Sequence, residues 1–174
     1  MIKGWGRLVE LDNLISARLR VAEKPGLLRS AFAILAHSGD SWFWLIGLGA
    51  LWLWGSEYWK ERTKVLIIGI VALACLVILI KFIVRRKRPE GEWGMIYRNT
   101  DPHSFPSGHA ARAFLLAVLS IYLGPAWFGW VVLIWAPFVS LARIAMGLHY
   151  VSDVAAGMFL GIGLGVGFTY FQIY

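Results

Sequence analysis

The twenty residues VLIIGIVALACLVILIKFIV, from Val65 to Val84, decide the fold of this chain. Only Lys81, close to the end of the stretch, carries a charge. An α-helix rises about 1.5 Å per residue, so a helix of this length crosses the roughly 30 Å hydrocarbon core of a bilayer. The stretch therefore predicts a transmembrane helix.

The whole chain has the composition of a membrane protein. Of its 174 residues, 59% are hydrophobic and the mean hydropathy is +0.65, whereas soluble domains contain about 45–50% apolar residues. We expect a single membrane-embedded domain over residues 1–174 with an all-α fold, a polytopic transmembrane helical bundle, because helices satisfy their own backbone hydrogen bonds in lipid. Five spans are predicted: Ser41–Tyr58, Val65–Val84, Ser107–Leu123, Pro125–Met146 and Tyr150–Phe171.

Residues 1–40, which precede the first span, are predicted to lie in the membrane interface. From Gly6 to His37, apolar residues recur at helical spacing with arginines between them, and Lys24-Pro25-Gly26 breaks the segment into two short helices. The net charge of +7 then favours membrane lipids with anionic headgroups over nucleic acid as partners, and no obligate protein partner is predicted. The single cysteine, Cys75, argues against a disulfide framework and is expected to be a small buried side chain.

Counting the membrane crossings places the unusual polar residues on one face of the membrane. The second and fourth spans end on the face where the third and fifth begin. This face receives Lys81, Arg88, His109, Arg143, His149 and Asp153. Ionisable groups at membrane depth are costly, so residues gathered in this way are candidates for a functional site.

The spacing of these residues favours phosphoryl transfer. Lys81 and Arg88 are seven positions apart, so both cations project from one helix face. His149 and Asp153 are four apart, which predicts a carboxylate that orients the imidazole. Pro106-Ser107-Gly108 opens a helix, whose unpaired N–H groups bind anions. In such a site one histidine attacks phosphorus and the other protonates the leaving oxygen.

Two further features lie outside this cluster. Arg112, one turn after His109, either supports the site from behind or forms a structural ion pair, for which Asp101 is the candidate partner. The glycines at 161, 163, 165 and 167 lie inside an apolar span with no strand before them, so they predict close helix packing rather than a nucleotide loop.

Three segments of the chain resemble the signatures of the type 2 phosphatidic acid phosphatase superfamily, which holds integral-membrane lipid phosphate phosphatases and, more distantly, vanadium haloperoxidases. The signatures are Lys-x6-Arg-Pro, Pro-Ser-Gly-His and Ser-Arg-x5-His-x3-Asp. The matching segments are KFIVRRKRP (Lys81–Pro89), PSGH (Pro106–His109) and ARIAMGLHYVSD (Ala142–Asp153). One departure is Ala142, which stands where the family usually has serine.

The resemblance implies a role for each matching residue. His149 would be the nucleophile that forms a phosphohistidine, Asp153 its orienting partner, and His109 the general acid. Lys81, Arg88 and Arg143 would hold the phosphate, together with Ser107 and the amide of Gly108. No metal or other cofactor is implied, and vanadate is expected to inhibit. The family's membrane enzymes commonly have six spans, so a sixth remains possible.

The resemblance implies a lipid phosphate substrate, and four candidates stay open: phosphatidylglycerophosphate, phosphatidic acid, undecaprenyl diphosphate and the 1-phosphate of lipid A. It also implies a multi-pass protein of the inner (cytoplasmic) membrane with its site at the periplasmic or outer face. The charge bias disagrees, because all but three of the 17 lysines and arginines fall on the catalytic side, and such an excess marks the cytoplasm. A non-catalytic lipid-phosphate binding or transport bundle and a vanadate-dependent haloperoxidase-like enzyme are the alternatives.

Overall fold

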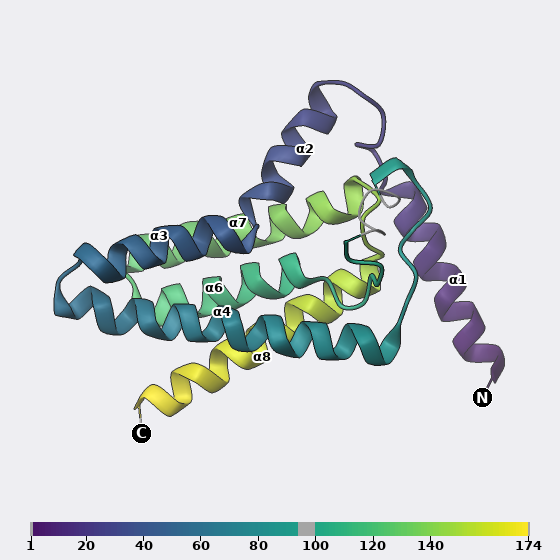
Figure 1. Cartoon of the computed structure of the whole chain (residues 1–174). Helices are drawn as coiled ribbons and strands as arrows, with labels where there is room; N and C mark the ends of the chain where they lie inside the picture. Colours follow the sequence, from purple (N-terminus) through teal and green to yellow (C-terminus); the bar gives the residue numbers. More distant parts are fainter. Residues whose placement is uncertain (1, 94–99, 174) are drawn as a thin grey trace.

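The computed structural model describes residues 2–93 and 100–173, whose helices form an elongated bundle (Figure 1). The predicted all-α fold is confirmed. In chain order the helices are α1 (Ile2–Arg18), α2 (Leu27–Ser38), α3 (Ser41–Trp54), α4 (Glu57–Val84), α6 (Gly108–Leu123), α7 (Ala126–Ala145) and α8 (Val151–Ile173).

Three of these helices have the length and apolar composition needed to cross a membrane. They are α4, α7 and the part of α8 from Val151 to Phe171. The helices α3 and α6 are apolar but shorter, with 14 and 16 residues, or about 21 and 24 Å. The predicted count of five spans is therefore confirmed for three helices, and for α3 and α6 it stays a prediction.

The first predicted span ends earlier than its apolar residues suggest. Helix α3 stops at Trp54 because Gly55 takes an extended conformation (φ −77°, ψ 164°), and α4 begins at Glu57, eight residues before the predicted span. Helix α4 turns one face, which includes Leu66, Leu73 and Val77, toward the protein core. Cys75 lies outside that face and is exposed, so the expectation that it is buried is wrong.

Helix α6 is the centre of the bundle and packs against α4, α7 and α8. Its side chains are buried around most of its circumference, including Ala111, Leu115 and Leu119, none of which is exposed. A helix can be apolar around most of its circumference when most of its sides meet protein. The central position fixes where its first turn, with the predicted site residues Gly108 and His109, meets the other helices.

Glycines on α8 allow α6 to approach closely, as the sequence predicts for part of the glycine-rich stretch. A Cβ atom at Gly161 would lie 2.0 Å from the carbonyl oxygen of Ala111, and one at Gly165 would lie 2.9 Å from Cβ of Val118. Gly163 and Gly167 have nothing within 4 Å of such an atom. Every second glycine of the stretch therefore serves helix packing, and the packing prediction is wrong for the other two.

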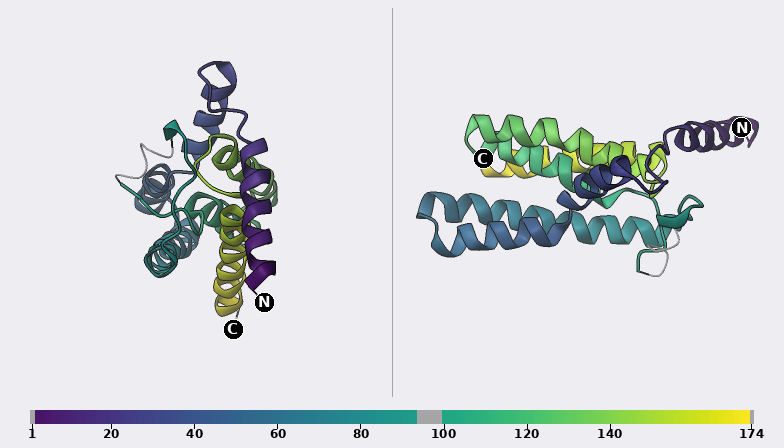
Figure 2. Two further views of the ribbon diagram at one scale, coloured as in Figure 1. Left: turned by 90° about the vertical axis from the view of Figure 1, so that its right-hand side faces the viewer. Right: turned by 90° about the horizontal axis from the view of Figure 1, so that it is seen from above.

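The first two helices differ in how they contact the bundle. Helix α1 extends away from one end (Figures 1 and 2), and its Leu8, Leu11 and Leu14 are more than half exposed. Helix α2 packs against α7 and buries Ala36. The predicted break at Lys24–Gly26 is confirmed, because α1 ends at Arg18 and α2 begins at Leu27. An interfacial position for α1 stays a prediction.

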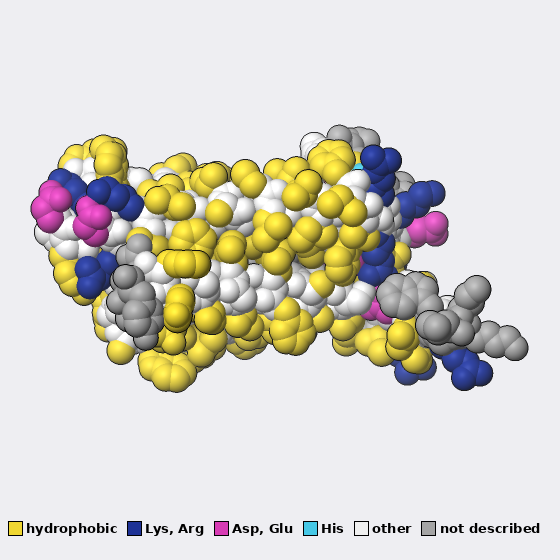
Figure 3. All heavy atoms as spheres, turned by 90° about the horizontal axis from the view of Figure 1, so that it is seen from below, with side chains coloured by type: hydrophobic (Ala, Val, Ile, Leu, Met, Phe, Trp, Pro, Cys, Tyr) yellow, Lys and Arg dark blue, Asp and Glu magenta, His cyan; other side chains and the backbone are white. Residues whose placement is uncertain are grey.

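The surface in Figure 3 is divided into an apolar middle and two charged ends. Lysines, arginines and acidic residues gather at both ends of the bundle, and hydrophobic side chains cover the length between them. This is the distribution expected of helices that cross a bilayer, with their charged residues in the two interfaces.

Candidate active site

The three motif segments meet at one end of the bundle. Lys81 lies in the last turn of α4, Arg143 in the last turn of α7, and Asp153 in the first turn of α8. Ser107 caps α6, because its hydroxyl oxygen accepts a hydrogen bond from the Ala110 N–H. All these side chains are buried, as are those of Arg88 and His149. The backbone N–H of Ser107 also donates to the Asp153 carbonyl (2.9 Å), which joins the second motif to the third.

Arg88 connects the first motif to His149. Its NH1 atom lies 3.2 Å from His149 Nε2 and donates to the carbonyl oxygen of Leu148 at 2.9 Å. A guanidinium can only donate, so Nε2 of His149 accepts, and the proton of the neutral ring lies on Nδ1. The side chain of Arg88 is only 2% exposed. The nitrogen that would attack phosphorus therefore lies beside a buried cation.

His149 has the protonation state that a nucleophile needs. Burial lowers its pKa well below the usual 6.5, and the positive charges of Arg88, Arg143 and Lys81 lower it further. The imidazole is consequently neutral at physiological pH. An unprotonated nitrogen surrounded by cations is suited to attack an anionic phosphorus centre, because the cations neutralise the phosphate before the bond forms.

His149 and Asp153 face each other, as predicted, but they do not lie on one helix face. The sequence spacing places both on one helix face, but α8 begins only at Val151, and His149 lies in the turn before it. Nδ1 of His149 is 3.6 Å from Oδ2 of Asp153, a contact longer than a hydrogen bond. The same oxygen accepts a hydrogen bond from the Tyr150 N–H at 3.0 Å. Asp153 thus caps α8 and faces His149 at the same time.

Arg86 supports Asp153 from outside the family motifs. Its NH1 atom donates to Oδ1 of Asp153 (2.8 Å), and its NH2 atom donates to Asp12 of α1 (2.7 Å). Asp12 also accepts hydrogen bonds from the backbone N–H and the hydroxyl of Ser152. Sequence reasoning missed Arg86 and Asp12 because their partners lie 66 to 140 positions away. No local spacing links these residues, and Arg86 stands in a run of basic residues from Arg85 to Arg88 that does not single it out.

Asp101 lies between two of the cations that the family resemblance assigns to phosphate. Its carboxylate oxygens are 2.8 and 2.6 Å from Nζ of Lys81, and Oδ2 is 2.7 Å from NH2 of Arg88. Burial opposes ionisation, but the hydrogen bond from Lys81 and the charges of Lys81 and Arg88 lower the pKa of Asp101. Asp101 was the candidate partner of Arg112 in one of the two roles left open for that arginine; the structure pairs Asp101 with Lys81 and Arg88 instead.

His109 contacts a carboxylate that the sequence did not indicate. Its Nε2 atom is 2.6 Å from Oδ1 of Asp40, in the short connection between α2 and α3. Arg112, one turn further along α6, donates to the carbonyl oxygen of Gly39 and to the hydroxyl of Ser41, on either side of Asp40. Arg112 therefore takes the supporting role of the two that the sequence left open.

A cavity of about 620 Å³ joins these groups. His109, His149, Lys81 and Asp101 line its polar end. From Lys81 the lining continues along α4 over apolar residues, which are Ile70, Leu73, Ala74, Val77 and Ile78, with Trp42 of α3 among the lining residues as well. The polar end suits a phosphate, and the apolar part suits a hydrocarbon chain.

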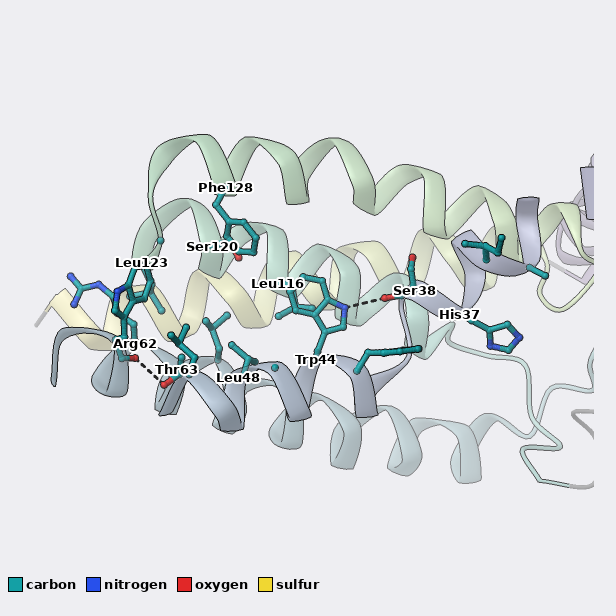
Figure 4. A pocket seen from close by; sticks show the side chains of 18 residues that line it. His37, Ser38, Trp44, Leu48, Arg62, Thr63, Leu116, Ser120, Leu123 and Phe128 are labelled. Carbon is teal, nitrogen blue, oxygen red and sulfur yellow. Dashed lines mark hydrogen bonds between the residues drawn. The ribbon is translucent and has the colours of Figure 1, made fainter. Parts of the chain in front are cut away.

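A second cavity, of about 760 Å³, is shown in Figure 4. Its described lining residues are mostly apolar, among them Leu48, Leu116 and Phe128, and none belongs to the three motifs. His37 and Ser38 lie at one end and Arg62 at the other (Figure 4). This cavity is lined mainly by apolar side chains, and its described lining lacks the paired motif histidines and the motif lysine of the first cavity.

Within residues 2–93 and 100–173, no group of three or more His, Cys, Asp or Glu side chains could hold a metal ion. The positive charges of the site come from the buried side chains of Lys81, Arg88 and Arg143. The prediction that catalysis needs no metal stays a prediction.

The fold and site define a class: a helical membrane protein with a cationic, histidine-containing cavity at the edge of its apolar part. A family model for the PAP2 superfamily matches residues 62–174. The chain therefore belongs to the PAP2 superfamily, as its three motifs predict.

Individual relatives agree with this assignment. The chain is 32% identical over 162 residues to decaprenylphosphoryl-5-phosphoribose phosphatase of Mycobacterium tuberculosis, covering 90% of this chain and 86% of that protein. It superposes on the crystal structure of Aquifex aeolicus LpxE with a TM-score of 0.71 and 27% identity, covering 93% and 94% of the two chains. A PAP2-type phosphatidylglycerolphosphate phosphatase from Bacillus subtilis shares the fold, with a TM-score of 0.76, 23% identity and coverage of 96% and 87%.

Proposed function

We propose that this protein is a lipid phosphate phosphatase that works through a phosphohistidine on His149. The observation that carries the proposal is a single cavity lined by two histidines and a buried lysine, with Arg88 bonded to the attacking nitrogen. The Mycobacterium tuberculosis relative, which is a phosphatase by name, supports the same reaction class. The proposed reaction is hydrolysis of a phosphomonoester or diphosphate on a lipid.

The first half of the reaction forms the phosphoenzyme. The substrate phosphate binds to Lys81, Arg88 and Arg143, with the Ser107 hydroxyl and the Gly108 amide at the start of α6 as further donors. Nε2 of His149 forms a bond to phosphorus while the bond from phosphorus to the leaving oxygen breaks. His109 gives a proton to that oxygen. In the second half, water attacks phosphorus, His109 takes its proton, and His149 is released.

The site needs no metal in this proposal, because three cationic side chains neutralise the phosphate. Arg88 and Lys81 are almost completely buried, and charges in a water-poor site act more strongly on a developing negative charge. The phosphate and the carboxylate of Asp101 compete for these two cations, so substrate binding displaces Asp101 or shares the cations with it.

The apolar part of the cavity supports a lipid as the substrate. It runs down α4 from Lys81, so a phosphate at the polar end places the attached chain among Val77, Leu73 and Ile70. Phosphatidylglycerophosphate, phosphatidic acid, undecaprenyl diphosphate and the 1-phosphate of lipid A all fit this description. The relative in Mycobacterium tuberculosis adds polyprenyl-linked sugar phosphates to the compounds to be tested.

Ala142 does not prevent this chemistry. Its side chain packs in an apolar cluster with Ala36 of α2 and Met146, so a hydroxyl at this position would have apolar neighbours. The phosphate donors named above lie on other residues. We infer that the missing hydroxyl changes the rate of turnover and leaves the mechanism intact.

The inner membrane is the proposed location, with the site at the periplasmic or outer face. Lys87 is exposed near the site, and Lys60 lies at the other end of α4. In a Cys75→Ala background, cysteine introduced at position 87 should react with a membrane-impermeant maleimide in spheroplasts, and cysteine at position 60 only after lysis. The reverse result would place the site in the cytoplasm.

Phosphate release from the purified protein tests the activity. In detergent, the wild type should release phosphate from at least one lipid phosphate of the set above, and His149→Ala should release none. Lipid binding without hydrolysis by the wild type would favour a non-catalytic binding or transport bundle. Vanadate-dependent oxidation of halide would favour the haloperoxidase-like alternative.

A further inference from the structure

We propose that Asp40 is a positioning residue for catalysis, which holds the ring of His109 so that its Nδ1 atom exchanges the proton with the leaving group and with water. This inference rests on the proposed function. Asp40 lies outside the three family motifs, in the connection between α2 and α3. Each histidine of the site then has its own carboxylate: Asp153 faces His149, and Asp40 faces His109.

The contacts of Asp40 determine which nitrogen of His109 carries which proton. Oδ1 of Asp40 is 2.6 Å from Nε2 of His109, and Oδ2 is 3.1 Å from Nδ1 of His37. Burial raises the pKa of Asp40, but the hydrogen bonds from His109 and His37 outweigh it and lower the pKa below its usual value. An ionised carboxylate only accepts hydrogen bonds, so Nε2 of His109 carries a proton. Nδ1 is left for the reaction.

The turn that carries Asp40 is fixed on several sides. Arg112 donates to the carbonyl oxygen of Gly39 at 2.9 and 2.5 Å and also to the hydroxyl of Ser41. The indole N–H groups of Trp44 and Trp135 donate to the carbonyl and hydroxyl oxygens of Ser38, at 3.1 and 2.9 Å.

Gly39 allows this turn to lie close to the bundle. A Cβ atom at position 39 would lie 2.8 Å from Cγ1 of Val139 and 3.4 Å from Cδ2 of His109. Residue 39 therefore has to be small for Asp40 to reach His109. His109 and Arg112 are on the same face of α6, so one helix supplies both the proposed acid and the clamp on the turn that orients it.

Asp40 keeps its own protonation state throughout the proposed reaction. In the positively charged ring both nitrogens carry a proton, and Nδ1 of His109 gives its proton to the lipid oxygen when the bond from phosphorus to that oxygen breaks. When water later attacks the phosphohistidine, Nδ1 takes a proton from the water and the cycle closes. The N–H at Nε2 stays bonded to Asp40 in both steps, so the carboxylate stabilises the positively charged form of the ring without being protonated.

Substrates with different leaving groups test this role. A lipid alkoxide needs a proton to depart, whereas the nitrophenolate of p-nitrophenyl phosphate does not. In Asp40→Ala we expect kcat/KM for the lipid phosphate to fall by about 100-fold, the lower part of the range for general acid–base catalysis. The value for p-nitrophenyl phosphate should stay within a few fold of the wild type, because it reports only steps up to the first departure.

Two further variants keep the test decisive. Asp40→Glu, which retains a carboxylate, should recover part of the lost activity on the lipid phosphate. Glu61→Gln, which removes a carboxylate at the far end of α4, should leave both values unchanged. Equal losses on the two substrates would show that Asp40 only supports the fold, and unchanged activity would show that it has no role. Absence of phosphate release by the wild type would instead overturn the proposed function.

Discussion

NH1 of Arg88 lies 3.2 Å from Nε2 of His149, although the two residues are 61 positions apart in the chain. The contact joins the first family motif to the third. It also fixes the hydrogen-bonding state of the resting ring, because the guanidinium donates and Nε2 accepts. An arriving phosphate oxygen can take over this hydrogen bond and bring phosphorus to the freed nitrogen.

Arg88→Gln should lower kcat/KM for the lipid phosphate by at least about 100-fold. The substitution removes a buried charge that contacts the attacking histidine, and the loss of one such donor costs roughly that factor. The measurement is phosphate release at several substrate concentrations. Lys87→Gln, at the exposed neighbouring position, is the matched control and should retain activity. Equal activities of Arg88→Gln and wild type would remove Arg88 from the site.

The part of the acid limb of the pH profile that reports His149 should lie well below pH 6.5. A neutral His149 is required for attack, and its lowered pKa keeps the ring neutral as the pH falls through 6.5. Arg88→Gln removes one of the positive charges that lower this pKa, so its acid limb should move to higher pH. The measurement is kcat/KM between about pH 4 and pH 8.

Ionisation of the substrate also contributes to that profile, because the second pKa of a phosphate monoester is about 6. Substrate ionisation is the same for both enzymes, so only a difference between them reports His149. Identical acid limbs for the wild type and Arg88→Gln would contradict the assignment.

Asp101→Asn should strengthen inhibition by orthovanadate. The wild-type carboxylate neutralises Lys81 and Arg88, and an anion has to compete with it. The side chain of Asp101 is 41% exposed. Removing its competing charge should therefore strengthen vanadate binding by about 1 kcal/mol, which lowers the inhibition constant about fivefold. Glu90→Gln, on the exposed surface, should not change inhibition. Weaker inhibition in Asp101→Asn would mean that Asp101 helps to organise the cations for anion binding.

Gly161→Ala should destabilise the bundle by about 1–3 kcal/mol, because the added methyl group meets the backbone of Ala111. Gly163→Ala, two residues further, adds the same atom where nothing lies within 4 Å. It should leave stability unchanged or raise it slightly, since alanine favours helix. Thermal unfolding in detergent compares the two. Equal unfolding temperatures would contradict the close contact of α6 with α8.

Hydrophobicity and parity predicted the end of the bundle at which the site lies. The motif residues Lys81, Ser107 and Arg143 are at helix termini, and termini follow from the lengths of apolar runs. The extent of α6 was predicted to within one residue, as Ser107–Leu123 against the observed Gly108–Leu123. The end of α3 was not, because apolar residues continue toward Tyr58, whereas the helix ends before Gly55, which is extended.

Two carboxylates of the site, Asp40 and Asp12, were the part that sequence reasoning missed. Asp40 lies 69 positions from His109, and Asp12 lies 74 positions from Arg86. Neither pair has a local spacing that could signal contact, since tertiary packing alone brings them together. His149 and Asp153 had such a spacing, yet their contact forms across the start of α8 rather than along one helix face. The i, i+4 spacing therefore predicted the right pair of residues, although the helical geometry assumed for the pair was not the observed one.

Trapping the phosphoenzyme tests the central proposal most directly. Protein incubated with a radiolabelled aryl phosphate and quenched in alkali should carry acid-labile, alkali-stable label on His149. His109→Ala should accumulate that label, because the aryl group departs without a proton while hydrolysis lacks its base. His149→Ala should carry none. Label of the same stability in His149→Ala, or phosphate release by that variant at the wild-type rate, would contradict the assignment of His149 as the nucleophile.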